Sequence, residues 1–155
     1  MKIKVIGLGN PLRGDDGLGV AAIQRLAEKG HLPGGVELID GGLCGLGLLE
    51  LIDGADAVVL VDAVHTDAPS GTIIRATADQ IQHAESAPGS VHDFRVGEAL
   101  RLAAALGTPL PPITLIGMVP DNISPGENLS PVVEANLARL VDAIRDRVRQ
   151  AATST

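Results

Sequence analysis

Three polar residues lie at the ends of expected strands or at the beginning of an expected helix. Asp16 comes soon after the apolar run 3–8, Asp62 ends the apolar run 57–61, and His92 lies in the first turn of a predicted helix. If the strands are parallel neighbours, the three side chains can face one cleft at the carboxyl ends of the strands. Two carboxylates and one imidazole suit a borderline divalent ion such as Ni²⁺ or Zn²⁺, with positions left for water or substrate.

Each of these residues also has a simpler explanation. An acidic residue such as Asp16 stabilises a helix N-terminus, Asp62 fits a loop cap at a strand end, and His92 fits an exposed first-turn residue. Only their common location favours a site, and the sequence does not give their separation. His65 is close to Asp62 along the chain, which makes it a candidate for supporting the site without binding the metal.

The elements that must position these residues alternate between strand and helix. We expect strands over residues 3–8, 36–39, 57–61, 71–76 and 113–119. We expect helices ending near Lys29, over 43–52, from Ser90 to Gly107, and from Pro131 through Val148, with 77–90 irregular. Ser130 is the expected N-cap of the last helix, and Ser90 with Asp93 resembles a capping box.

Unbroken apolar strands between helices predict an α/β fold, a three-layer α/β/α sandwich with a mostly parallel five-stranded sheet. Arg75 indicates that its strand lies at an edge of this sheet. The chain of 155 residues fits a single domain over 1–150, and we expect 151–155 to be a disordered tail.

Composition excludes several classes of protein. The net charge is −7, and Phe94 is the only aromatic residue, so neither phosphate neutralisation nor base stacking favours a nucleic-acid partner. No apolar stretch reaches the length of a membrane-spanning helix, so no membrane association is expected. A single cysteine, Cys44, precludes an internal disulfide and fits the cytoplasm.

Other enzyme chemistries fit the sequence poorly. The run Gly7-Leu8-Gly9 lacks the third glycine of a dinucleotide loop, and Asp15 and Asp16 put negative charge where a pyrophosphate would bind. Cys44 is best explained as a small buried residue, because no histidine is an evident partner. The sequence therefore shows no nucleophile system based on serine or cysteine.

Several motifs resemble those of one known family. The run from Gly7 to Gly19, Gly-Leu-Gly-Asn-Pro-Leu-Arg-Gly-Asp-Asp-Gly-Leu-Gly, resembles the opening of the [NiFe]-hydrogenase maturation endopeptidases. Further matches follow in order at 40–42, 61–63, 90–93, 116–120 and 129–131. The resemblance covers most of the chain, from about residue 3 to about residue 145.

This resemblance implies an endopeptidase that removes a C-terminal extension from the precursor of a hydrogenase large subunit after nickel insertion. It implies that Asp16, Asp62 and His92 carry catalysis and recognise nickel, which the precursor supplies; in isolation they are expected to accept another divalent ion such as zinc. Many members have Glu at the place of Asp16. The segment Asp40-Gly41-Gly42 resembles a substrate-recognition loop, although Leu43 replaces the threonine that commonly follows it.

Two mechanisms remain open at this point. The three residues either bind the precursor's nickel as a check on loading, or they also use the metal to polarise the scissile carbonyl or activate a water. Two other functions also remain. One is a non-catalytic nickel-checking or metal-delivery module, and the less favoured one is peptidyl-tRNA hydrolase, which shares the Gly-Leu-Gly-Asn-Pro opening but needs basic and aromatic residues.

Overall fold

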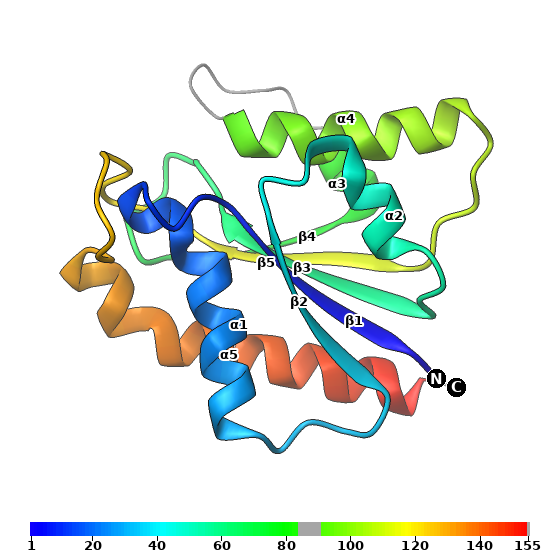
Figure 1. Cartoon of the computed structure of the whole chain (residues 1–155), viewed down its shortest axis with the longest axis horizontal. Helices are drawn as coiled ribbons and strands as arrows, with labels where there is room; N and C mark the ends of the chain where they lie inside the picture. The colour runs from blue at the N-terminus through cyan, green and yellow to red at the C-terminus, as the bar shows by residue number, and fades with distance from the viewer. Residues whose placement is uncertain (84–90, 155) are drawn as a thin grey trace.

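The computed structural model describes residues 1–83 and 91–154, and for 91–95 it describes only the backbone (Figure 1). Its strands are β1 (Ile3–Leu8), β2 (Val36–Gly42), β3 (Ala57–Ala63), β4 (Ile73–Thr77) and β5 (Ile113–Met118). Its helices are α1 (Leu18–Lys29), α2 (Leu48–Ile52), α3 (Ala78–His83), α4 (Val91–Ala105) and α5 (Pro131–Thr153). Two short 3₁₀ turns, η1 (Gly14–Gly17) and η2 (Gly45–Gly47), precede α1 and α2.

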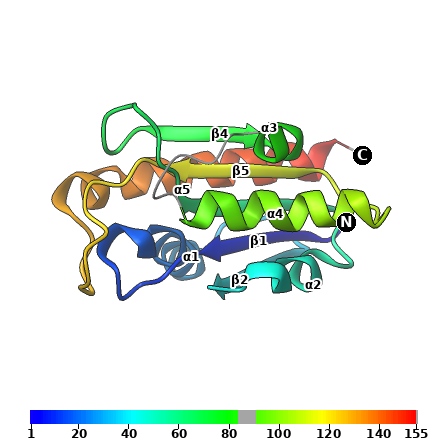
Figure 2. The ribbon, with the colours of Figure 1, turned by 90° about the horizontal axis from the view of Figure 1, so that it is seen from above.

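The five strands form one sheet in the order β2-β1-β3-β5-β4. All neighbouring pairs are parallel except β4 with β5, and the arrow of β4 in Figure 2 points opposite to those of β1 and β5. This confirms the predicted sheet and the edge position of the strand that carries Arg75. Consequently the carboxyl ends of β1, β3 and β5 lie at one edge of the sheet.

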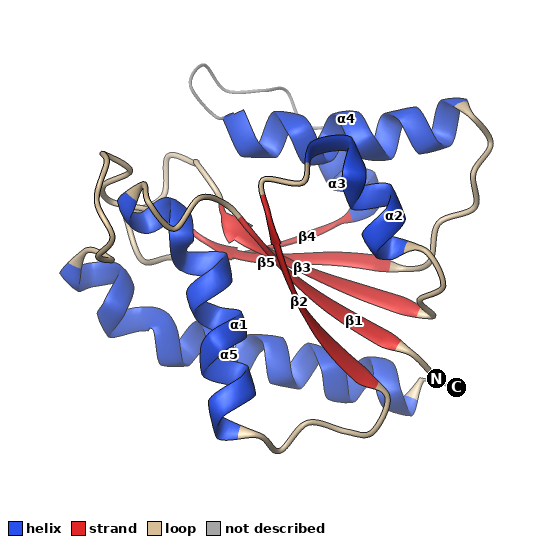
Figure 3. Ribbon diagram, viewed as in Figure 1, coloured by secondary structure: helices blue, strands red, loops and turns tan. Residues whose placement is uncertain are grey.

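Both faces of the sheet are covered by helices, as predicted (Figure 3). Successive side chains of a strand point to opposite faces. On β1, Ile3 and Val5 belong to the core beneath α1 and α5, whereas Ile6 and Leu8 belong to the core beneath α2, α3 and α4. The same alternation places Asp62 on the α4 face, because Val61 and Ala63 belong to the α1 face.

Two helices differ from the prediction. The helix expected over 43–52 is limited to α2, because Gly42 (φ 50°) and Gly45 (φ 55°) adopt left-handed backbone conformations that interrupt a helix. The segment 77–90 was expected to be irregular, but α3 occupies its first part. A capping box begins α3: Gln80 Oε1 accepts the Thr77 N–H at 2.9 Å, and Thr77 Oγ1 accepts the Gln80 N–H at 3.2 Å.

The C-terminal end of α5 and the beginning of α4 concern two further predictions, the disordered tail and the cap at Ser90. α5 continues to Thr153, and Ala151 is buried against the core, so a disordered tail from residue 151 is wrong for residues 151–153. Its good helix formers, Gln150-Ala151-Ala152, extend the apolar stripe by one more turn. The predicted cap at Ser90 lies outside the described residues.

A buried cation fastens α2 to the sheet. The side chain of Lys4 is 8% exposed, and its Nζ donates hydrogen bonds to the carbonyl oxygens of Leu51 (2.8 Å) and Asp53 (2.6 Å). These carbonyls lie at the C-terminal end of α2, where backbone acceptors have no partner within the helix. The short helix therefore gains from β1 the hydrogen bonds that its own length cannot provide.

Replacing Lys4 by Met should lower the free energy of unfolding by about 1–3 kcal/mol, because two part-buried carbonyl oxygens lose a charged donor. Lys2→Met is the matched control, since the Lys2–Glu37 pair is exposed at 3.5 Å and contributes at most about 1 kcal/mol. Urea titration followed by circular dichroism measures both, because the chain has no Trp or Tyr. Equal stabilities of the two variants would contradict the role of Lys4.

Candidate active site

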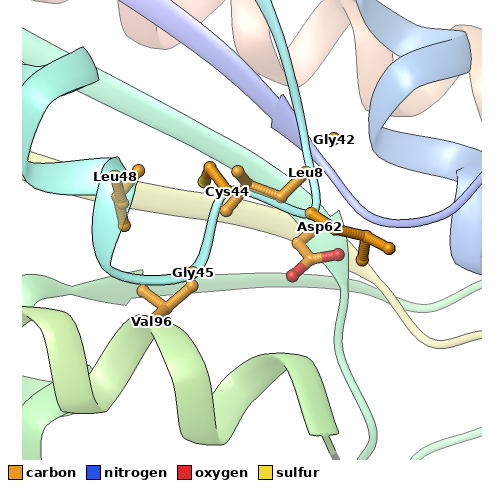
Figure 4. Close-up of a pocket in the computed structure, with 8 residues that line it drawn as sticks. Leu8, Gly42, Cys44, Gly45, Leu48, Asp62 and Val96 are labelled. Atoms are coloured by element: carbon orange, nitrogen blue, oxygen red, sulfur yellow. The ribbon is translucent and has the colours of Figure 1, made fainter.

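The end of β3 places Asp62 at the carboxyl edge of the sheet. Its side chain is 1% exposed, and its Oδ1 accepts the N–H of Ala63 at 2.8 Å. Gly117 on β5 pairs with Asp62 in register, and a side chain at Gly117 would overlap the Asp62 carbonyl oxygen. Figure 4 shows the Asp62 carboxylate pointing to the side of the sheet on which α4 lies.

Asp16 reaches the same edge from η1. It is 2% exposed, and its Oδ2 accepts the N–H of Asn10 at 2.8 Å. Gly9 lies beside both aspartates: a Cβ on Gly9 would overlap the Asp16 carbonyl oxygen and lie 3.4 Å from Asp62 Oδ1. The structure therefore brings Asp16 and Asp62 to one place, as the order of strands predicts.

A small pocket opens beside Asp62 on the α4 face of the sheet (Figure 4). Apart from the Asp62 carboxylate, its lining is mainly apolar: Leu8, Gly42, Leu43, Cys44, Gly45, Leu48 and Val96. Among the described lining residues, Asp62 is the one with a charged side chain, and that side chain is almost fully buried. A carboxylate in such a setting interacts more strongly with a cation than one in bulk water does.

The position of His92 can be given only along the helix. His92 is the second residue of α4, as the sequence predicts, and its side chain lies outside the described residues. Val96, which lines the pocket beside Asp62, follows it by four residues, and residues four apart lie on the same face of an α-helix. Within residues 1–83 and 96–154, no group of three His, Cys, Asp or Glu side chains is placed to hold a metal.

The segment Asp40-Gly41-Gly42 borders this pocket from the end of β2. Asp40 is exposed, and its Oδ1 accepts the Gly42 N–H at 3.1 Å, which closes a tight turn. The carbonyl oxygen of Gly42 accepts the N–H of Gly9 at 2.9 Å. The turn is therefore attached to the backbone at Gly9, which lies beside both aspartates.

His65, the residue considered as a support for Asp62, is half-buried in the loop after β3.

Cys44 is half-buried in the wall of the pocket rather than fully buried as expected. Burial raises the pKa of its thiol above the ordinary value of 9.0, and the negative charge of Asp62 acts in the same direction. The thiol is therefore protonated at neutral pH, and only the thiolate is a good nucleophile. This agrees with the prediction that cysteine does not carry the chemistry.

Cys44 should therefore react slowly with iodoacetamide at neutral pH, and the rate should still be rising with pH at pH 9.0, because the pKa lies above that value. Mass spectrometry of the alkylated protein gives the rate, with a cysteine-containing unstructured peptide as the reference. Alkylation at pH 7 as fast as that of the peptide would contradict the raised pKa.

Asp15, next to Asp16, is a buried polar residue to which the sequence analysis gives no role in the site. Its side chain is fully buried. Its Oδ2 accepts the N–H groups of Asp121 and Asn122, both at 2.9 Å, and the Ser130 hydroxyl at 2.7 Å; its Oδ1 accepts the Ser130 N–H at 2.7 Å. Ser130 is the N-cap residue of α5, as predicted, but its hydroxyl donates to Asp15 and makes no side-chain cap for the helix.

Burial alone would raise the pKa of Asp15, but these hydrogen bonds from Asn122, Ser130 and Asp121 outweigh it and hold the pKa below its ordinary value of 3.8. No local pattern marks Asp15, because its partners lie more than 100 residues further along the chain.

The lowered pKa gives stability a definite dependence on pH. The folded form binds its proton less readily than the unfolded chain, so the contribution of Asp15 is complete above pH 3.8 and is lost as the pH falls through the lower, folded-state pKa. Asp15→Asn should cost about 2–3 kcal/mol at neutral pH and should flatten the loss of stability below pH 3.8. Urea unfolding at neutral and acidic pH tests this; parallel curves for the two proteins would contradict it.

A mostly parallel sheet with buried carboxylates at its carboxyl edge is the arrangement of an α/β enzyme whose site lies beyond the strand ends. A family model described as hydrogenase maturation protease matches residues 20–147, a span that contains Asp62 and His92. The hydrogenase expression/formation protein HupD of Rhodobacter capsulatus is 32% identical over 148 residues, which are 94% of this chain and 70% of that protein. The hydrogenase 2 maturation protease of Escherichia coli is 28% identical over 152 residues, covering 97% and 92%.

Solved structures agree. The hydrogenase maturating endopeptidase HybD of E. coli superposes with a TM-score of 0.85 at 26% identity, over 97% of this chain and 94% of that one. The [NiFe] hydrogenase maturation protease HybD of Thermococcus kodakarensis gives 0.77 at 27% identity, over 96% and 99%. The chain belongs to the hydrogenase maturation protease family, as its motifs predict. It is accordingly a hydrolase, an endopeptidase of hydrogenase processing.

None of the described helices is long and apolar enough to cross a membrane.

Proposed function

We propose that this protein removes the C-terminal extension from the precursor of a [NiFe]-hydrogenase large subunit once nickel has been inserted, and that Asp16, Asp62 and His92 recognise that nickel. The observation that supports the proposal most is that two buried aspartates meet at Gly9: a Cβ there would overlap the Asp16 carbonyl oxygen and lie 3.4 Å from Asp62 Oδ1. A nearby positive charge favours the ionised form of a carboxylate, so two buried aspartates at one edge of the sheet are suited to bind a cation. Both also accept a backbone N–H, which fixes their orientation.

The position of His92 supports the third ligand. His92 is the second residue of α4 and precedes the pocket residue Val96 by four positions, which is about one helical turn. Two carboxylate oxygens and one imidazole nitrogen form a set that accepts Ni²⁺ and leaves coordination positions for ligands of the precursor. In the isolated protein, without the precursor, we expect the same three side chains to accept another divalent ion such as Zn²⁺.

Recognition of nickel makes cleavage follow nickel insertion. A precursor that contains nickel gains contacts with the three side chains, and an empty precursor lacks them, so the difference in affinity favours cleavage after loading. The exposed turn Asp40-Gly41-Gly42, beside the pocket, is suited to select the precursor polypeptide. We place the reaction in the cytoplasm, the reducing compartment that suits one free cysteine.

Hydrolysis by water fits the site better than an acyl-enzyme. The thiol of Cys44 is held protonated by burial and by Asp62, so it is a poor nucleophile. The carboxylates of Asp16 and Asp62 are the groups placed to accept a proton from an attacking water. The reaction is thus proposed as metal-linked peptide hydrolysis, with nickel brought by the substrate.

The test is mass spectrometry of a nickel-loaded large-subunit precursor incubated with the wild-type protein, Asp62→Asn or His92→Ala. The wild type should release one C-terminal peptide, and each variant should be slower by at least about 100-fold, because a ligand is lost. Asn at 62 retains an oxygen acceptor for the Ala63 N–H, so the local backbone should be preserved.

Asp146→Asn is the matched control, because it removes an acidic charge from the exposed face of α5 and should leave cleavage unchanged. Nickel-free precursor should stay intact with every protein. An intact precursor that binds the wild type in a nickel-dependent way would replace the proposal by a nickel-checking module. Near-normal cleavage by His92→Ala would remove His92 from the site.

A further inference from the structure

The loop before α1 and the loop before α5 are joined along their length. Gly14 N–H donates to the Gly126 carbonyl oxygen and Gly126 N–H to that of Leu12, both at 2.8 Å. Asp15 N–H donates to the Asn122 carbonyl oxygen at 2.9 Å. The two segments thus form one hydrogen-bonded unit at the carboxyl edge of the sheet, although α1 and α5 begin far apart in the sequence.

The carboxylate of Asp15 is the centre of this unit, because it accepts four hydrogen bonds from the segment 121–130. Asp16 is its neighbour in η1, and both backbones are part of the same 3₁₀ turn. Any movement of Asp15 away from Ser130 therefore displaces Asp16. The Oδ2 of Asp16 would then move relative to Asn10, whose N–H it accepts.

We propose that Asp15 and Ser130 are positioning residues: their hydrogen bonds hold η1 so that the Asp16 carboxylate lies beside Asp62 at the distance that the reaction needs. This rests on the function proposed above, because it assigns Asp16 to the site. Neither Asp15 nor Ser130 acts on the substrate. Their effect is carried through η1 to Asp16, which is one of the two aspartates assigned to the site.

The Ser130 hydroxyl is the best group with which to test this. It donates to Asp15 and makes no cap for α5, so removing it leaves the start of the helix unchanged. In Ser130→Ala, Asp15 keeps its three backbone N–H donors, which preserve the fold. Ser130→Thr restores the hydroxyl and is the conservative rescue.

The first readout is the kinetics of precursor cleavage. Ser130→Ala should lower kcat about tenfold and leave KM within about twofold, since a small misplacement of a reacting group slows the chemical step. Ser130→Thr should recover most of the wild-type kcat. Equal kcat for the wild type and Ser130→Ala, or a loss that Ser130→Thr does not recover, would overturn the proposal.

The second readout does not depend on activity. The Asn10 amide bonds to Asp16 Oδ2, so its chemical shift in a ¹H–¹⁵N spectrum reports the place of the Asp16 carboxylate. Ser130→Ala should shift the Asn10 amide, and Ser130→Thr should return it. An unmoved Asn10 signal would overturn the proposal even if cleavage fell. If the wild type itself does not cleave the precursor, the proposed function fails, and the Asn10 shift still decides whether Asp15 and Ser130 position Asp16.

Discussion

The buried carboxylate of Asp15 is the interaction on which the site depends. An ionised group without solvent is unfavourable unless every acceptor position is used, and Asp15 uses its two oxygens for four donors. Those donors belong to the segment that leads into α5, whereas Asp15 belongs to the turn that leads into α1. One side chain therefore joins the two helices of one layer at the edge where the strands end.

Close backbone packing is the second constraint. Gly7, Gly9 and Gly19 lie where β1, η1, α1 and the end of β3 approach each other, and a Cβ at any of them would overlap a neighbouring carbonyl oxygen. The glycines allow the turn with Asp16 to lie directly against the strand end with Asp62. A buried pair of acids thus forms without long side chains, which agrees with aspartate rather than glutamate at position 16.

Much of this arrangement could be predicted from local patterns. Alternating and unbroken apolar runs indicate the strands, and the rule that parallel strands end at one edge brings Asp16 and Asp62 together before any coordinates are known. Asp15 could not be predicted, because its partners are set by tertiary contacts. The helix expected over 43–52 is too long, because Gly42 and Gly45 adopt left-handed backbone conformations despite the leucine-rich composition of the segment. The prediction does not include α3, although Thr77 and Gln80 form a capping box at its beginning.

The hydrogen bond between Asp15 and the Ser130 N–H joins residues 115 positions apart. Contacts of such long sequence separation carry a high entropic cost of loop closure and tend to form late in folding. The Ser130 donors to Asp15 become available only after more than four-fifths of the 155-residue chain has been synthesised. A polypeptide that ends before residue 130 therefore lacks two of the four hydrogen bonds that the Asp15 carboxylate accepts in the complete fold.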